Sequence, residues 1–178
     1  MTRRHELRCY DYVNRPHEEV RQALTADALG IFGRATHSAA ARASDLGTAL
    51  RVRIGALELV ADVEIQITAI ADARSPDDQA AMRLDLTWKS RRRPGLFPAM
   101  AGALWVYALA PSETQIEFIG TYDPPLGLVG EAIDAVVMRR IAEASVQRFV
   151  SDVASFLRVD VPAPPGLGST AALVDRPV

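Results

Sequence analysis

The clearest pattern in the sequence is a long alternation of apolar and polar residues between Leu57 and Ala69. Apolar side chains fall on the odd positions, and polar ones fall on most of the even positions. A period of two over this length predicts a β-strand with one buried face and one face in water. Leu50–Ile54 alternates in the same way, and Gly55-Ala56 separates the two runs. A two-residue turn there predicts a hairpin with the pairs Ile54–Leu57, Val52–Leu59 and Leu50–Ala61 on its buried face and Arg53–Glu58 on its wet face.

Four further segments have the character of strands. Met82–Trp88 and Ile116–Tyr122 alternate between apolar and polar residues, and Leu7–Val13 is rich in residues that favour strands. Met100–Leu109 is apolar on both faces, so we expect both of its faces to be covered. Proline cannot donate to a strand ladder, so Pro124-Pro125 is expected to end the last strand.

Three helices are expected around these strands. Between the first and second strands, Pro16 opens a short helix to about Leu24, and the alanine-rich stretch Thr25–Ala43 predicts a second one. A long helix is expected from about Leu128 to Leu157, with a length of about 45 Å. Its apolar residues point in two directions along its length, so its C-terminal half is expected to meet the short helices or a partner chain.

The order of these elements predicts an α+β fold. An antiparallel sheet that is wet on one face must bury the other, and the last helix is the long amphipathic element that can cover it. We therefore expect a curved antiparallel sheet of about six to seven strands wrapped around the C-terminal helix. The predicted domain spans residues 1–158, and the proline-rich residues 159–178 are expected to form a disordered tail.

Composition limits the classes of partner and the cellular compartments that we expect for this protein. A formal net charge of −2 argues against binding to nucleic acid, which favours a basic excess. No apolar run is long enough to span a membrane, and the N-terminus lacks the pattern of an export signal. Cys9 is the single cysteine, so no intrachain disulfide can form, and we expect a reducing, cytoplasmic setting. Abundant alanine and arginine with little lysine is typical of a high-GC bacterial genome.

Several local motifs resemble one known superfamily. Tyr12–Val20 looks like its first strand and first helix, and Leu96-Phe97-Pro98 like the segment before its fifth strand. Gly120–Gly127, followed by Gly130, Asp134 and Ala142–Val146, looks like its last strand and closing helix. Over roughly residues 5–158 the chain resembles the START/Bet v 1-like helix-grip superfamily (SRPBCC), which is also called the polyketide cyclase/dehydratase and lipid-transport superfamily. The likeness is greatest to its bacterial stand-alone members.

The resemblance implies a hydrophobic cavity between the sheet and the last helix. Pockets of this kind hold apolar ligands, with a few polar groups fixing the orientation. The same side chains could instead fill the core, and the sequence leaves both alternatives open. The residues expected to line the cavity are Leu84, Leu86, Trp88, Leu104, Val106, Phe118, Tyr122, Ile133, Val137 and Ile141.

Candidate catalytic residues are few. Asp134 lies near the expected cavity, where a partly buried carboxylate could act as an acid or base, and Tyr122 or Tyr107 could offer a hydroxyl to a ligand carbonyl. Structural roles are the alternative for all three. The spacing of histidine, cysteine and acidic residues predicts no metal site, and we expect no cofactor.

The basic cluster formed by Lys89 and the three residues Arg91, Arg92 and Arg93 is either a solvated loop or an anion site near the mouth of a pocket. Three functions follow from the sequence. The first is binding of a small hydrophobic ligand, lipid-like or polyketide-like, without chemistry. The second is a cyclase/dehydratase-like enzyme, and the third is a protein-interaction module, with a homodimer left open. We expect binding rather than catalysis, because no complete catalytic set is recognisable.

Overall fold

One antiparallel sheet and two helices make up the described structure. The computed structural model describes residues 5–36, 40–41, 45–54, 57–90, 99–123 and 135–159, with side chains for 5–36, 64–89, 99–122 and 139–159. In chain order the elements are β1 (His5–Val13), α1 (His17–Ala35), β2 (Ala40–Ala41), β3 (Asp45–Ile54), β4 (Leu57–Arg74), β5 (Ala80–Ser90), β6 (Ala99–Ala110), β7 (Glu113–Asp123) and α2 (Ala135–Val159).

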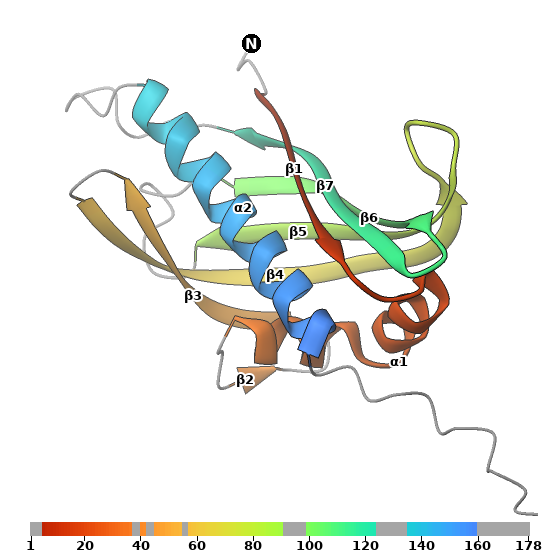
Figure 1. The fold of residues 1–178 in the computed structure, drawn as a ribbon. Helices are drawn as coiled ribbons and strands as arrows, with labels where there is room; N and C mark the ends of the chain where they lie inside the picture. Colours follow the sequence, from red (N-terminus) through yellow and green to blue (C-terminus); the bar gives the residue numbers. More distant parts are fainter. Residues whose placement is uncertain are drawn as a thin grey trace, which may run out of the picture.

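The sheet brings the first strand beside the last. Its strand order is β1-β7-β6-β5-β4-β3-β2, so every strand from β2 to β7 pairs with its neighbour along the chain. The sheet curls around α2, which lies along its concave face and contacts β1 on one side and β3 on the other (Figure 1). The expected α+β architecture, an antiparallel sheet covered by a C-terminal helix, is confirmed.

The hairpin predicted from the alternating pattern has the expected register. Ile54 pairs with Leu57, Val52 with Leu59, and Leu50 with Ala61. Arg53 and Glu58 are also cross-strand partners, as expected. The turn residues 55–56 and the tail from residue 160 lie outside the described residues.

Helix α1 differs from the two short helices expected here. It runs from His17 to Ala35 and is interrupted at Asp27, whose backbone is non-helical (φ −157°, ψ 59°). Two helical segments are therefore present, but the second ends well before Ala43. The expectation of a helix to Ala43 is wrong, because Ala40–Ala41 form β2 and pair with β3. Alanine has a high helix propensity, but pairing with a neighbouring strand overrides it here.

Asp27 begins the second segment of α1 as an N-cap residue. Its Oδ1 accepts a hydrogen bond from the Gly30 backbone N–H at 2.9 Å, three residues further on, which is the geometry of a helix cap. A Cβ on Gly30 would lie 2.1 Å from Asp27 Oδ2, so glycine leaves room for the capping carboxylate. Arg34 adds an ion pair to Asp27 at 3.1 Å.

The buried side chains of α2 form one continuous stripe. They recur at spacings of three and four residues from Ile141 to Leu157, and Phe149 lies at its centre, completely buried. The Phe149 ring meets Phe32 of α1 edge-to-face, with centroids 5.1 Å apart. The C-terminal half of α2 therefore packs against α1 of the same chain, which is one of the two alternatives left open by the sequence.

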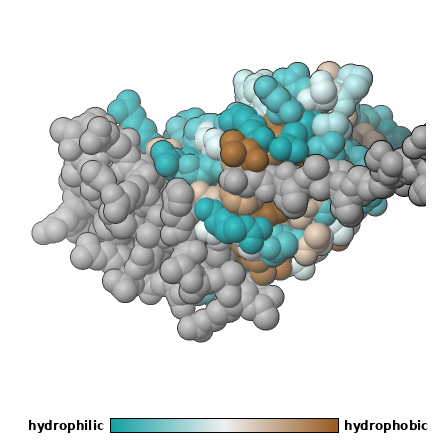
Figure 2. All heavy atoms as spheres, turned by 60° about the horizontal axis from the view of Figure 1, so that its bottom comes forward, coloured by the Kyte–Doolittle hydropathy of each residue, from teal (hydrophilic) through white to brown (hydrophobic). Residues whose placement is uncertain are grey.

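Large apolar side chains are scattered over the described surface. Tyr10 and Tyr12 of β1 touch each other, while Ile70, Leu109 and Val159 are exposed elsewhere. From the side where α1 lies, hydrophobic atoms form small patches among hydrophilic ones (Figure 2). Within the described helices, no segment is both long and apolar enough to cross a membrane.

We predict that Asp27→Ala lowers the free energy of unfolding by about 1 kcal/mol, because the cap of the second helical segment is lost. Urea unfolding followed by circular dichroism measures the change. Asp27→Asn is the matched control, since its amide oxygen can still accept from Gly30, and it should retain most of the stability. Equal losses in the two variants would contradict the capping role.

Candidate functional site

Five inward-facing residues form a row across one end of the sheet. Cross-strand pairing places Trp88 of β5 beside Met100 of β6, and Met100 beside Tyr122 of β7. Ile65 of β4 and His5 of β1 complete the row at its two ends. All but His5 belong to the buried core, and the His5 and Tyr122 rings stack with centroids 5.1 Å apart. The row therefore places three aromatic side chains with polar atoms, those of Trp88, Tyr122 and His5, in an otherwise apolar layer.

The neighbouring row contains two facing glycines. Gly102 of β6 pairs with Gly120 of β7, and an added Cβ at either position would lie within 2.7 Å of the Phe118 ring. The Phe118 ring therefore lies directly against the glycine pair. Trp88 stacks near-parallel to Phe118 at 5.8 Å and 11°, and Phe149 of α2 meets Trp88 edge-on at 5.4 Å. Together, Trp88, Phe118 and Phe149 form what we call the aromatic layer between the sheet and α2.

The indole nitrogen of Trp88 is the exception in this layer. Its side chain is 3% exposed, and Nε1 has no hydrogen-bond partner within the described structure. An indole N–H can only donate, and buried donors are almost always paired. The aromatic layer therefore holds one polar group that its own side chains leave unsatisfied.

The cavity residues expected from the sequence gather at this layer. Eight of them are buried in the single hydrophobic core: Leu84, Leu86, Trp88, Leu104, Val106, Phe118, Tyr122 and Ile141. Ile133 lies outside the described residues, as does the side chain of Val137. Of these eight, Trp88 alone lines either of the two hollows found among the described residues. The other seven pack against one another in the described structure.

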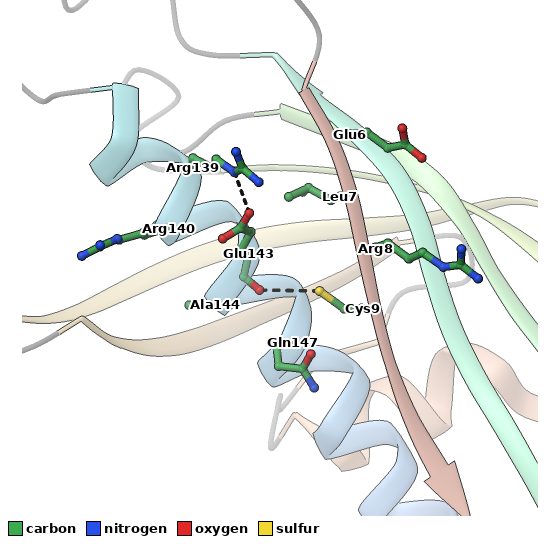
Figure 3. Close-up of a pocket in the computed structure, with 9 residues that line it drawn as sticks. All are labelled: Glu6, Leu7, Arg8, Cys9, Arg139, Arg140, Glu143, Ala144 and Gln147. Carbon is green, nitrogen blue, oxygen red and sulfur yellow. Dashed lines mark hydrogen bonds and ion pairs between the residues drawn. The ribbon is translucent and has the colours of Figure 1, made fainter.

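The larger hollow is an open groove of about 810 Å³ between β1 and α2 (Figure 3). Leu7 and Cys9 of β1 line it and also belong to the hydrophobic core, so its floor reaches the core. On its α2 side, Arg139 Nε and Glu143 Oε1 form an ion pair at 2.7 Å. The Glu143 carbonyl lies 3.9 Å from Cys9 Sγ.

The pKa of Tyr122, a member of the row, depends on two charged residues of this groove. Burial raises the pKa of its hydroxyl, the Arg139 guanidinium lowers it, and the Glu143 carboxylate raises it again. The net effect is a hydroxyl that stays protonated at neutral pH, which suits a hydrogen-bond donor or an acid better than a base.

The smaller hollow, of about 290 Å³, lies on the opposite face of the sheet. Thr87 and Lys89 contribute to it, and Lys89 Nζ lies 4.0 Å from the Glu64 carboxylate. Arg91, Arg92 and Arg93, the rest of the predicted basic cluster, lie outside the described residues. The described lysine is therefore balanced by a carboxylate at this hollow.

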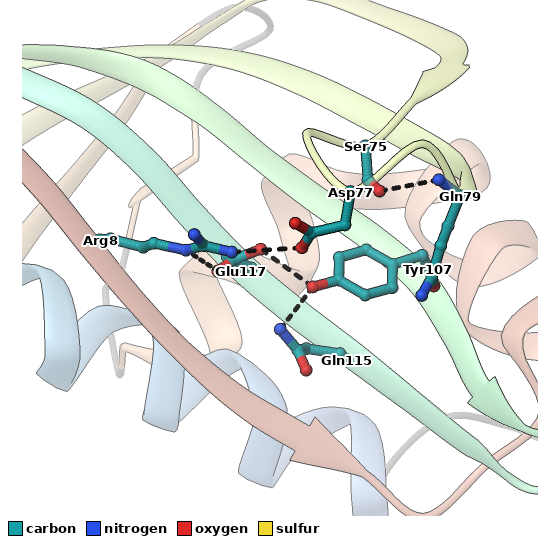
Figure 4. Close-up of polar contacts among 7 residues, drawn as sticks. All are labelled: Arg8, Ser75, Asp77, Gln79, Tyr107, Gln115 and Glu117. Atoms are coloured by element: carbon teal, nitrogen blue, oxygen red, sulfur yellow. Dashed lines mark hydrogen bonds and ion pairs between the residues drawn. The ribbon is translucent and has the colours of Figure 1, made fainter.

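A polar cluster on the outer face was missed by the sequence analysis (Figure 4). Glu117 lies on the face expected to be wet, yet it is 1% exposed. Its carboxylate accepts hydrogen bonds from Arg8 and from the Tyr107 hydroxyl, the latter at 2.9 Å. Gln115 donates to the Tyr107 oxygen, and Asp77 pairs with Arg8 at 3.4 Å. The buried charge is thus fully partnered, as in a structural ion-pair network.

The remaining candidate residues take structural positions or are not described. Asp134 and His37 lie outside the described residues. His17 Nε2 lies 3.1 Å from the Val106 carbonyl, and Asp11 accepts from Arg158. Across the described residues, no group of three metal-binding side chains comes together.

This arrangement is that of a known architecture. A curved antiparallel sheet wraps a C-terminal helix, with the first strand beside the last. The solved structure of Zhui aromatase/cyclase from Streptomyces sp. R1128 is similar over 90% of this chain and 98% of its own, with a TM-score of 0.51 and 15% identity. The chain has the helix-grip fold.

Other solved structures are similar at comparable levels. A protein from Thermus thermophilus is 13% identical over 86% of this chain and 97% of its own, with a TM-score of 0.49. Ara h 8.0201 is 13% identical over 87% of this chain and 98% of its own, also with a TM-score of 0.49. No protein-family model and no curated protein sequence matches the chain. The resemblance stated from the sequence is confirmed as a resemblance of fold.

We predict that the Cys9 thiol is nearly inert in the folded protein. Burial raises its pKa from 9.0 to about 11, and the Glu143 carboxylate acts in the same direction. At pH 8 this lowers the thiolate fraction about 100-fold, so alkylation by iodoacetamide should be slowed at least that much relative to the urea-unfolded chain. Mass spectrometry follows the reaction.

The same shift has a consequence for stability. The pKa of the Cys9 thiol is higher in the folded chain than in the unfolded chain. Its contribution to the free energy of unfolding is therefore fully present below pH 9 and is lost as the pH rises from 9 towards 11. Cys9→Ala should therefore flatten the alkaline decline in stability. Alkylation of the folded protein at the unfolded rate would contradict the burial of the thiol.

We predict that Tyr107→Phe lowers the free energy of unfolding by about 1 kcal/mol, because Glu117 loses a hydrogen-bond donor in a buried setting. Thermal unfolding measures the effect. Tyr10→Phe is the control, since Tyr10 is 51% exposed and should change stability little. If Tyr107→Phe is as stable as the wild type, the outer cluster does not stabilise the sheet.

Proposed function

We propose that the protein binds a small hydrophobic molecule, lipid-like or polyketide-like, between the sheet and α2. The observation that carries this proposal is the aromatic layer on the facing glycines Gly102 and Gly120. Because neither glycine has a side chain, the centre of the inner face is covered by the single ring of Phe118. A change of rotamer at Phe118 would open space there for a planar or chain-like ligand.

The chemistry of the layer favours an apolar ligand. Trp88, Phe118 and Phe149 supply broad aromatic faces, and the surrounding core adds aliphatic side chains. Each 100 Å² of apolar surface removed from water contributes about 2.5 kcal/mol, which favours binding of an apolar ligand against the free-energy cost of its lost freedom of motion. The fold shared with an aromatase/cyclase supports the same interpretation.

The groove between β1 and α2 offers a route to this layer. Leu7 and Cys9 form its floor and are also part of the core, so a ligand that enters there meets apolar surface directly. Arg139 is paired with Glu143, and Arg140, which also lines the groove, adds a positive charge that favours molecules with a carbonyl or carboxylate end.

A second candidate is a cyclase/dehydratase-like enzyme, and one specific observation favours it. The Tyr122 hydroxyl lies in the electrostatic range of Arg139 and Glu143 and is held in its protonated form by burial. Such a group could donate a proton to a developing oxyanion while Arg139 stabilises the charge. Asp134 is a further acid–base proposal that rests on the sequence.

The cellular setting that we propose is the cytoplasm. Cys9, the single cysteine of the sequence, is a buried free thiol, as is common for proteins of reducing compartments. A small apolar molecule is the proposed partner, and self-association stays open.

We predict that the protein carries an apolar molecule of its host and that Leu86→Trp abolishes this. Leu86 faces the aromatic layer, next to Gly102, and an indole there would occupy the space that a ligand needs. Native mass spectrometry after incubation with an organic extract of the host measures occupancy.

The matched control is Thr87→Trp. Thr87 is the next residue on the same strand, so its side chain points to the opposite face, where it lines the smaller hollow. Occupancy should persist in this variant. Loss in Thr87→Trp but not in Leu86→Trp would move the site to the outer face, and an empty wild-type protein would contradict the proposal.

A further inference from the structure

The starting point is the unsatisfied indole N–H of Trp88. The five buried Ser, Thr and Glu side chains of the described structure all have a partner. Ser145 donates to the Ile141 carbonyl, Thr114 to the Arg15 carbonyl and Thr36 to the Phe32 carbonyl. The side chains of Ser75 and Glu117 accept hydrogen bonds. Nε1 of Trp88 is the one buried side-chain nitrogen or oxygen among the described residues that has none.

A donor without an acceptor is costly in this position. The indole lies between Phe118 and Phe149, and its cross-strand neighbours are Ile65 and Met100. A phenylalanine at position 88 could make the same ring contacts without burying an N–H. The N–H therefore adds nothing to the stability of the folded chain by itself.

A trapped water is a poor partner for this group. A buried water is held by about three hydrogen bonds, and apolar surroundings leave cavities dry. The ring contacts of Trp88, which are Phe118 and Phe149, and its cross-strand neighbours, Ile65 and Met100, have no side-chain nitrogen or oxygen. A carbonyl oxygen, by contrast, is satisfied by a single donor while the rest of its molecule packs on the apolar layer.

We propose that Trp88 Nε1 donates a hydrogen bond to a carbonyl oxygen of the bound ligand, so that the site selects aromatic or polycyclic ketones over hydrocarbons of the same shape. The proposal rests on the proposed function and specifies its ligand class. The rings of Trp88 and Phe118 are near-parallel, tilted by 11°. A flat ring system that stacks on Phe118 beside the indole would therefore lie in the plane of the Trp88 ring, where the N–H points at its oxygen.

The test compares 2-acetylnaphthalene with 2-ethylnaphthalene, two probes of nearly equal shape of which only the first has a carbonyl oxygen. The sequence has two tryptophans, so a ¹H–¹⁵N spectrum shows two indole signals, and Trp105→Phe assigns them. Trp105 serves as an internal control, because it lies on the outer face under the Arg83 guanidinium. We expect the ketone, but not the hydrocarbon, to move the Trp88 indole proton downfield, with the Trp105 signal unchanged.

Equilibrium dialysis gives the energetic counterpart. Trp88→Phe should weaken binding of 2-acetylnaphthalene about 5- to 10-fold and leave that of 2-ethylnaphthalene within about 2-fold. Trp105→Phe should bind both probes like the wild type. If Trp88→Phe does not fold, the chemical-shift comparison on the wild-type protein decides by itself.

The outcomes separate the two proposals. If both probes bind equally and the Trp88 signal responds alike to each, the preference for ketones is overturned while ligand binding stands. If neither probe binds, aromatic ligand binding in the layer fails, and the role of Trp88 fails with it. Binding of both probes that is lost in Leu86→Trp, with a ketone-specific shift at Trp88, supports both.

Discussion

The close packing of the Phe118 ring on Gly102 and Gly120 is the constraint on which the inner face depends. A side chain at either glycine would collide with the ring and with the neighbouring backbone, at contacts of 2.6 to 2.7 Å. With the ring in this place, Trp88 stacks near-parallel to it and Phe149 of α2 meets Trp88 edge-on. The position of the helix over the sheet, and the burial of the indole N–H, follow from this arrangement.

Buried polar side chains are partnered differently on the two faces of the sheet. On the outer face, the buried Glu117 carboxylate is matched by Arg8 and Tyr107, so its charge is balanced within the chain. On the inner face, Trp88 has no such partner among the residues that the structure describes. A polar network in which every group is paired is best explained by its contribution to stability. A single unpaired hydrogen-bond donor in an apolar layer is best explained by a partner that is not part of the chain.

The groove and the aromatic layer belong to one functional region. Leu7 and Cys9 line the groove and also belong to the core, and the charges of Arg139 and Glu143 at the groove shift the pKa of the Tyr122 hydroxyl. The proposed ligand binding and the proposed proton donation would therefore use neighbouring parts of the same concave face. This proximity is why we propose a binding protein first and a cyclase-like enzyme second.

Local patterns determined the strands and their register. The alternation around Gly55-Ala56 predicted the pairing of Ile54 with Leu57 correctly, because alternation and turn length act over a few residues. The inward placement of Leu86, Trp88 and Phe118 also followed from alternation. Tertiary structure decided what each position contacts. Arg8 lies 109 residues from Glu117, and the missing acceptor of Trp88 can be recognised only when every neighbour is in place, because burial and pairing are properties of the assembled layers.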